Sequence, residues 1–508
     1  MKKIFAILLT FCMLASMLCV PAFAAEELPA PASDVVIRVT ARDKKTAEDV
    51  LIKDYTEFDE GWEGAIDFAK DEGNREKYSR VFVDFYGDWT ADEDGVFGDS
   101  WRLGSNWGDG FQYSTIYIPE DVNITLNLNG HTINRDLEES ENDGEVIYID
   151  EGADVIINNG TITGGKSTNG AGGIHIHDAY VELNDVHIVG NIADNDDGGG
   201  IALYDGAELI MTRGSFTNNS IDGVYNNETF DCYGGAIYIE DSKAFFYSVD
   251  FKNNQNTNDE DYGAAIYSDN SVVYLSKCTF DGNGVADESK NVCASVAIVY
   301  AVDTTLTMEK VTFTNNGSYF VDSGYSSVTG LDSTLIALDD STLRLSGGST
   351  FTNNGACFMI SVKDDSNVYV EDTTFENNKS FVMFSSDHSD DSYFKNCTFE
   401  NNKVPNAETL FKGSDNTWIY TFRVYDEPLT FIDCKLSDST YFDRDCIVFE
   451  DTDAPNGNAR VASIFGEGSL AMVISLLALV AAGEALAVTL FAKKKKKEEE
   501  PQTAESEE

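Results

Sequence analysis

Apolar and polar residues alternate in short stretches through residues 121–440, and one pattern returns at intervals of 24 to 38 residues. Each copy centres on an apolar residue. Further apolar residues lie seven and five positions before the centre, and a Val, Cys or small residue lies two positions before it. Asn follows three positions after the centre in eight of the eleven copies. The central residues are Ile133, Ile162, Ile188, Phe216, Phe251, Phe280, Phe313, Phe351, Phe375, Phe399 and Leu436.

This spacing predicts strands and not helices. Residues two positions apart face the same side of a strand, and the three-residue step inside each copy predicts a bend between two short strands. A repeat whose length varies only between copies is typical of a solenoid whose insertions form loops. We therefore expect an all-β fold, a right-handed parallel β-helix of about eleven coils over residues 121–440.

The residue types of the repeat have mechanical roles in such a fold. The central Phe residues are expected to stack on one another inside the solenoid and bury aromatic surface from coil to coil. The Asn residue three positions later tolerates the left-handed backbone of a tight turn. Its side-chain amide can also hydrogen-bond to the equivalent Asn of the next coil and form a ladder.

Both ends of a solenoid expose strand edges that must be covered. Residues 25–120 are expected to form an N-terminal α/β cap. Within it, Trp62, Ala65, Ile66 and Ala69 have the spacing of a short amphipathic helix, and a strand follows. Four of the five Trp lie in this region, where packing within the cap is favoured over a glycan-binding patch.

The two chain ends predict a membrane-anchored surface protein. Residues 1–24 have two lysines, an apolar stretch and an Ala-Phe-Ala cleavage site, which is typical of a secretory signal peptide. Residues 469–492 are apolar apart from one Glu and long enough for a transmembrane helix, and five lysines follow directly. The prediction is a single-pass protein of the cell membrane with an extracellular N-terminal region, a juxtamembrane linker at 441–468 and a cytoplasmic tail at 493–508.

The net charge of −53 narrows the choice of partner. No basic groove for nucleic-acid phosphates can be built, so nucleic acid is excluded as a partner. The acidic excess lies in the predicted extracellular region, which therefore favours neutral or cationic ligands over polyanions.

Two motifs of the repeat carry a resemblance to a known group. The motif Phe-x-x-Asn occurs seven times, and Gly-Gly-Ala-Ile is complete at residues 234–237. In both, the chain resembles the right-handed β-helix, pectate-lyase-like superfamily, and is most similar to the repeats of chlamydial polymorphic membrane proteins. The resemblance implies a surface adhesin that binds glycans or partner surfaces. Those relatives end in an outer-membrane barrel, whereas this chain ends in an apolar segment and lysines.

Two other functions stay open. Enzymes of this superfamily act on polysaccharides as lyases or hydrolases, but the Gly-His-Gly and Arg-x-Lys motifs of the hydrolases do not occur in the sequence. His131, in a Gly-His-Thr sequence, is expected to face inward with a structural role. An acidic surface also repels acidic substrates. We expect no catalysis, with a polysaccharide lyase or hydrolase as one alternative and a passive structural rod as another.

One predicted outer face carries aromatic rings and acids together. If Ile174 and Ile176 point inward, the residues between and after them point outward. Exposed aromatic rings beside carboxylates suit sugars, while an ordinary stabilising side-chain ladder is the alternative. A metal site at the two histidines is the weaker hypothesis, since no third ligand is evident. The candidate ligand-binding residues are His175, His177, Tyr204, Tyr238, Glu240, Tyr267 and Asp269.

An acidic loop at residues 193–198 could hold Ca²⁺ through Asp194, Asp196 and Asp197. The loop matches neither an EF-hand nor the nonapeptide of Ca²⁺-binding β-rolls, so solvated loop charge is the alternative. No other cofactor is expected.

Seven cysteines remain after removal of the signal. Cys278, Cys397 and Cys434 occupy the inward position two before the centre of their copies, where other copies have Val, and are expected to be small buried residues. Neighbouring coils could be bridged by a disulfide, but Cys278 and Cys397 are four coils apart.

Overall fold

The computed structural model describes most of the predicted cap and repeat region. The described residues are 28–91, 115–137, 144–168, 170–194, 196–222, 224–225, 228–229, 232–256, 262–284, 297–317, 334–386, 392–402, 422–424, 428–436 and 447–452. The predicted signal, transmembrane helix and cytoplasmic tail lie outside them. Within the described part of the chain, no helix is both long and apolar enough to cross a bilayer.

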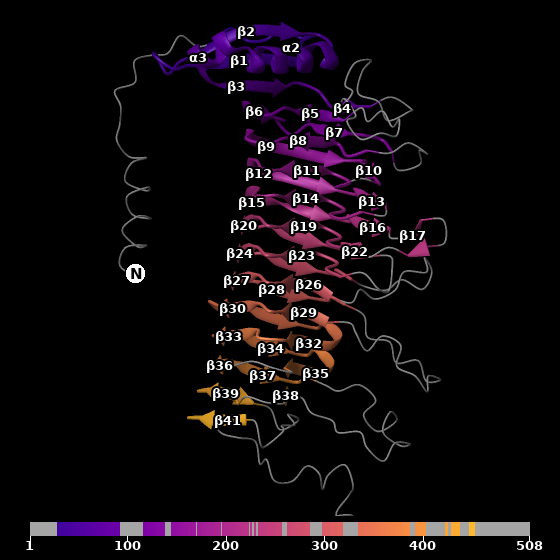
Figure 1. Cartoon of the computed structure of the whole chain (residues 1–508), viewed down its shortest axis with the longest axis vertical. Coiled ribbons are helices and arrows are strands. Elements are labelled where there is room, and N and C mark those ends of the chain that lie inside the picture. The colour runs from indigo at the N-terminus through magenta and orange to yellow at the C-terminus, as the bar shows by residue number, and fades with distance from the viewer. Residues whose placement is uncertain are drawn as a thin grey trace, which may run out of the picture.

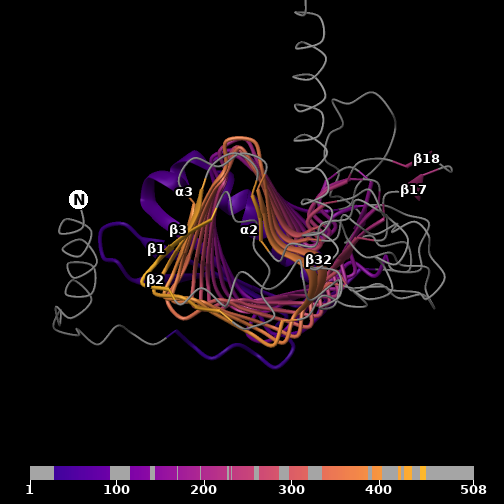
Figure 2. The same cartoon turned by 90° about the horizontal axis from the view of Figure 1, so that it is seen from below.

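The fold is all-β, and nearly all of its strands pair in parallel with the strand of the previous or next repeat (Figure 1). Viewed along the stack, the repeats superpose around one common core (Figure 2). This arrangement of long parallel sheets is compatible with a parallel β-helix. We use "coil" for one repeat of the stack.

The first sheet has two columns of strands along the stack. Its first column of strands is β6 (Asn123–Asn127), β9 (Asp154–Thr163), β12 (Tyr180–Val189), β15 (Glu208–Thr217), β20 (Lys243–Tyr247), β24 (Val272–Ser276), β27 (Thr305–Glu309), β30 (Thr342–Ser346), β33 (Asn367–Glu371), β36 (Tyr393–Lys395), β39 (Leu429–Ile432) and β41 (Ile447–Glu450). Strands β9, β12 and β15 continue into the second column. The other strands of that column are β4 (Trp89–Thr90), β7 (Thr132–Asn134), β21 (Asp250–Lys252), β25 (Thr279–Asp281), β28 (Thr312–Thr314), β31 (Thr350–Thr352), β34 (Thr374–Glu376), β37 (Thr398–Glu400) and β40 (Lys435–Leu436).

Two further parallel sheets complete the coils, beside a small antiparallel pair, β17 (Val224–Tyr225) and β18 (Glu228–Thr229). The second sheet consists of β5 (Ile116–Ile118), β8 (Ile147–Ile149), β11 (Ile174–His177), β14 (Ile201–Tyr204), β19 (Ile237–Glu240), β23 (Ile266–Asp269), β26 (Ala297–Val302), β29 (Thr334–Asp339), β32 (Gly355–Lys363), β35 (Lys379–Ser386) and β38 (Phe422–Val424). The third sheet consists of β10 (Lys166–Ser167), β13 (Ile192–Asp194), β16 (Ser220–Asp222) and β22 (Gln255–Asn256).

The predicted aromatic stack is confirmed. From Phe216 to Phe399, the central Phe rings of successive coils lie 4.3 to 5.1 Å apart between centroids, nearly parallel to one another. All of them are buried. Each ring therefore contacts the ring of the coil before and the coil after, and the apolar core runs unbroken along the stack.

The asparagine ladder is also confirmed, but its relation to the turn differs from the prediction. From Asn191 to Asn402, each Asn donates through Nδ2 to the Oδ1 atom of the next rung at 2.9 to 3.2 Å. The left-handed residue is the one before each rung, as at Asn315 with φ of 55°. The rung itself lies inside, where its amide satisfies buried backbone groups. Turn and ladder thus use two consecutive residues.

The cap is fused to the first sheet. Strands β1 (Ile37–Asp43) and β2 (Asp49–Tyr55) are antiparallel neighbours, and β3 (Tyr78–Phe85) pairs with β1 on one side and in parallel with β6 on the other. Helix α2 (Phe58–Lys70) buries its predicted stripe, and helix α3 (Glu72–Lys77) follows it. Trp62 and Trp89 both belong to the apolar core, so cap packing is confirmed for these two.

Two predictions about inward side chains have different outcomes. Cys278, Cys397 and Cys434 are buried as expected. The inward placement of His131 is wrong, because its ring is about one-third exposed and Nδ1 lies 3.3 Å from Oδ1 of Asp88. Leu128 is fully buried instead, in the space left beside Gly160 of the next coil.

Candidate functional site

The outer face of the second sheet carries the predicted ligand-binding residues. Ile174 and Ile176 are buried, so the outward direction predicted for the intervening side chains is confirmed. The strand register sorts the candidates into two columns that run along the stack. His175, Tyr238 and Tyr267 belong to the first column. His177, Tyr204, Glu240 and Asp269 belong to the second, nearer the corner with the first sheet.

The aromatic rings of this face form one continuous row, which we call the aromatic row. Successive ring centroids lie 4.6 to 5.9 Å apart. Ala202 occupies the first column in the fourth coil, and Tyr204 from the second column fills the space above it. The small residue therefore lets the row cross between columns without a gap. The row consists of Tyr117, Tyr148, His175, Tyr204, Tyr238, Tyr267 and Tyr300.

The expectation that all these rings are exposed is wrong for the later part of the row. Tyr238 and Tyr267 are only 7% and 8% exposed. Tyr233 stacks on Tyr267 at 4.4 Å, and Tyr262 lies 4.7 Å from Tyr300. Both covering residues come directly before the glycine motif of their coils, so this loop folds back over the sheet. The earlier part of the row remains half-buried.

His175 is held as a neutral ring inside the row. Tyr148 stacks on it at 4.6 Å and Tyr204 lies on its other side at 5.0 Å. Burial, together with the nearby His177, lowers the pKa of His175 to about 4. A neutral imidazole between two phenol rings provides a polar edge within an otherwise aromatic surface.

His177 points to a different set of partners. Its Nε2 atom lies 3.0 Å from Oδ2 of Asp205, and Nδ1 lies 3.8 Å from Oδ1 of Asp150. The histidine bridges acids of the coils before and after its own. It is therefore engaged with carboxylates, while His175 is enclosed by rings, and the two do not share a metal-binding geometry.

An acidic edge runs beside the aromatic row, at the corner between the second and first sheets. At this corner the backbone is left-handed in coil after coil, and the residue is nearly always Asp. Burial, followed by repulsion from neighbouring acids, raises the pKa of Glu240 and of Asp269 above their usual values. The acidic edge consists of Asp150, Asp178, Asp205, Glu240, Asp241, Asp269, Asp303, Asp339, Asp340 and Asp364.

The three acids of the predicted Ca²⁺ loop have separate partners. Asp194 forms an ion pair with Lys166 at 3.3 Å. Asp196 accepts a hydrogen bond from the backbone of Gly170, and Asp197 accepts one from the backbone of Tyr233. Their role in the structure is thus to tie the loop to neighbouring coils, and Ca²⁺ binding there stays a prediction. Among the described residues, carboxylates with oxygens within 4.8 Å of one another occur at Asp339, Asp340 and Asp364.

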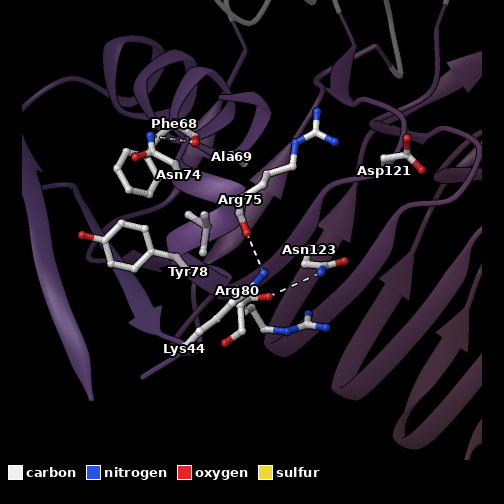
Figure 3. A pocket seen from close by; sticks show the side chains of 11 residues that line it. Lys44, Phe68, Ala69, Asn74, Arg75, Tyr78, Arg80, Asp121 and Asn123 are labelled. Atoms are coloured by element: carbon white, nitrogen blue, oxygen red, sulfur yellow. Dashed lines mark hydrogen bonds between the residues drawn. The ribbon is translucent and has the colours of Figure 1, made fainter. Parts of the chain in front are cut away.

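The cap contains a pocket that the sequence patterns did not predict (Figure 3). It encloses about 180 Å³ between α2, α3, β3 and the start of β6. Lys44, Arg75 and Arg80 line it, which is unusual in so acidic a chain. Arg80 is neutralised by Asp154 at 2.6 Å, and Lys44 donates to the carbonyl of Arg75. The pocket thus has a basic rim whose cations are partly used in holding the cap to the first coils.

Comparison with family models, with curated proteins and with solved structures gave no match. The resemblance to the repeats of polymorphic membrane proteins therefore rests on the two short motifs. For function, the geometry of the outer faces is the main source of evidence.

Proposed function

We propose that this chain is a membrane-anchored cell-surface protein, a right-handed parallel β-helix of about eleven coils that binds an extracellular glycan without catalysis. The anchor is the apolar segment 469–492, and the acidic excess belongs to the extracellular side. The ligand is a neutral or cationic glycan that lies along the second sheet.

The observation that carries this proposal is the position of the aromatic row directly beside the acidic edge. Sugar rings pack their apolar faces on aromatic rings, and their hydroxyls donate to carboxylates. Tyr204 and His175 provide half-buried ring surface, and His177, Asp205 and Asp150 provide polar partners on the adjacent column. The row follows the long axis of the stack, which suits an extended chain of sugar units more than a single sugar.

The sign of the charge supports the choice of ligand. The acidic edge repels uronates and sulfated glycans and attracts amino sugars with free amines. Because Glu240 and Asp269 have raised pKa values, a cationic group placed beside them also relieves the repulsion among neighbouring acids.

A glycan array probed with the purified chain in detergent tests the proposal. We expect binding to neutral or amine-bearing glycans, and the variant Tyr204→Ala should weaken it at least about tenfold, which corresponds to about 1.4 kcal/mol. The matched control is Tyr369→Ala, a half-buried ring on the outer face of the first sheet, and it should bind like the unaltered chain.

Other outcomes separate the alternatives. An array without any binding would favour a passive rod. Release of reducing ends or unsaturated sugars from polysaccharides would show an enzyme instead. Equal loss in both Tyr variants would mean that the aromatic row is not the binding surface. Recovery of the chain in the soluble fraction of lysed cells would contradict the membrane anchor.

A further inference from the structure

Two cysteines lie against each other near the C-terminal end of the stack. Thr398 pairs with Lys435 in the first sheet, so the residues just before them, Cys397 and Cys434, occupy equivalent inward positions of consecutive coils. The backbone N–H of Cys397 donates to Sγ of Cys434 at 3.4 Å. Cys434 lies in the coil directly after that of Cys397, whereas Cys278 is four coils away. This nearer pair was not predicted from the sequence.

The two thiols are packed in a geometry that suits a covalent link. Neighbouring strands of a sheet lie about 4.8 Å apart, which falls within the Cα separations of disulfides, about 4.4 to 6.8 Å. The side chains share a hydrogen bond, which raises the pKa of the Cys397 thiol and lowers that of Cys434. Cys434 is 7% exposed and Cys397 only 1%. Cys434 is therefore both the more accessible and the more easily ionised of the two.

We propose that Cys397 and Cys434 form an oxidation site, at which a low-molecular-weight disulfide such as glutathione disulfide joins the two coils covalently. The Cys434 thiolate attacks one sulfur of the oxidant, forms a mixed disulfide and releases one thiol. Cys397 loses its proton to solvent and attacks Sγ of Cys434, and a second thiol leaves. Two protein thiols are oxidised and one external disulfide is reduced to two thiols.

Access to this buried site comes from its place in the stack. Strand β41 is the last strand of the first sheet in the described part of the chain, and within that part its one partner is β39. Cys434 lies one coil before this end, and its backbone N–H donates to Oγ1 of Thr452. Terminal elements with few partners open locally more often than central ones. Opening of β41 exposes Cys434 without unfolding the coils that precede it.

Oxidation of the native full chain with glutathione disulfide tests the site. After the remaining thiols are alkylated, peptide mapping should show Cys397–Cys434 as the dominant cross-link. Cys397→Val and Cys434→Val should each abolish it, whereas Cys278→Val should leave it unchanged. Val occupies the same inward position in other coils, as at Val249 and Val311, so these variants keep the packing.

A second variant tests the route of access. Val311→Cys places a thiol one coil after Cys278, at the equivalent inward position but in the middle of the stack. We expect this central pair to oxidise at least about ten times more slowly than the terminal pair. Equal rates would overturn the role of the last coil. Thiols that both stay reduced, or a Cys434 that keeps glutathione without cross-linking, would overturn the oxidation site itself.

Discussion

Replacing Asn316 by alanine removes one rung from the middle of the asparagine ladder. Its Oδ1 atom accepts from the backbone N–H of Asn283 at 3.0 Å and from Nδ2 of Asn283 at 2.9 Å. Its Nδ2 atom donates to the carbonyl of Phe280 at 2.8 Å. The rung is fully buried, so no bulk water replaces these partners. Three polar groups of the preceding coil thus lose a hydrogen bond at once.

The structure sets the size of the effect. A buried polar group left without a partner costs about 1–3 kcal/mol. Three such groups lower the free energy of unfolding by about 3–9 kcal/mol if the surroundings do not rearrange. The matched control is Asn315→Ala, one residue earlier and exposed, with φ of 55°. Its cost is the left-handed backbone of an alanine together with the loss of the exposed hydrogen bond from Nδ2 of Asn315 to Oδ1 of Asp281, about 1–2 kcal/mol.

Two measurements check this prediction. Urea unfolding of both variants gives the change in stability, and hydrogen exchange of the backbone in β25 and β28 locates it. Exchange matters here because long repeat arrays do not always unfold as one unit. The ladder would have no special energetic role if Asn316→Ala were no more destabilising than Asn315→Ala.

Three further changes have defined outcomes. Phe313→Ala removes a buried ring of the aromatic stack and should lower the free energy of unfolding by about 3–5 kcal/mol in urea; a loss as small as that of Tyr369→Ala would contradict the stack. His175 has a folded-state pKa of about 4 against an ordinary 6.5, so the unfolded chain binds the proton first as the pH falls. Stability on the order of 3 kcal/mol is then lost between these values, and His175→Phe should flatten this part of a thermal-unfolding series against pH. Asp241→Asn should keep or raise the melting temperature at pH 7, since it reduces repulsion on neighbouring acids, and a clear decrease would show that the carboxylate is needed for folding.

The buried positions of the repeat could be predicted from the sequence, because their side chains have the same structural role in every coil. Phe251, Phe280 and Phe313 stack in register, and the Asn three positions after each forms the ladder. Apolar periodicity reports such positions directly. The left-handed residue lies one position earlier than predicted. Many coils have two consecutive Asn residues, and the sequence does not show which of the two has positive φ.

The outer surface was less predictable, because exposure there depends on loops that the repeat does not encode. Tyr233 and Tyr262 precede the glycine motif and have no periodic signal, yet Tyr233 covers Tyr238 and Tyr267 and Tyr262 lies against Tyr300. The pocket of the cap likewise brings Lys44 together with residues of α3 and β3. Its cations could have been noted as a basic cluster in an acidic chain, but their convergence depends on the folding of the cap. The adjacency of Cys397 and Cys434 could have been predicted from the sequence by counting coils, because both occupy the same inward position in consecutive coils.

The left-handed corners explain why Asn and Asp recur in this chain, but they do not explain why each corner prefers one of the two. The turn that precedes each ladder rung uses Asn or Gly, whereas the corner between the second and first sheets uses Asp almost throughout. Asn and Asp both tolerate positive φ, so backbone conformation alone does not select between them. The Asp residues also carry a cost, because burial and then neighbouring acids raise the pKa of Glu240 and Asp269. The backbone conformation therefore does not require this charge, and its negative sign suits the proposed cationic ligand. Among the described residues, the Asp residues with positive φ at this corner are Asp121, Asp178, Asp205, Asp241, Asp303, Asp340 and Asp364.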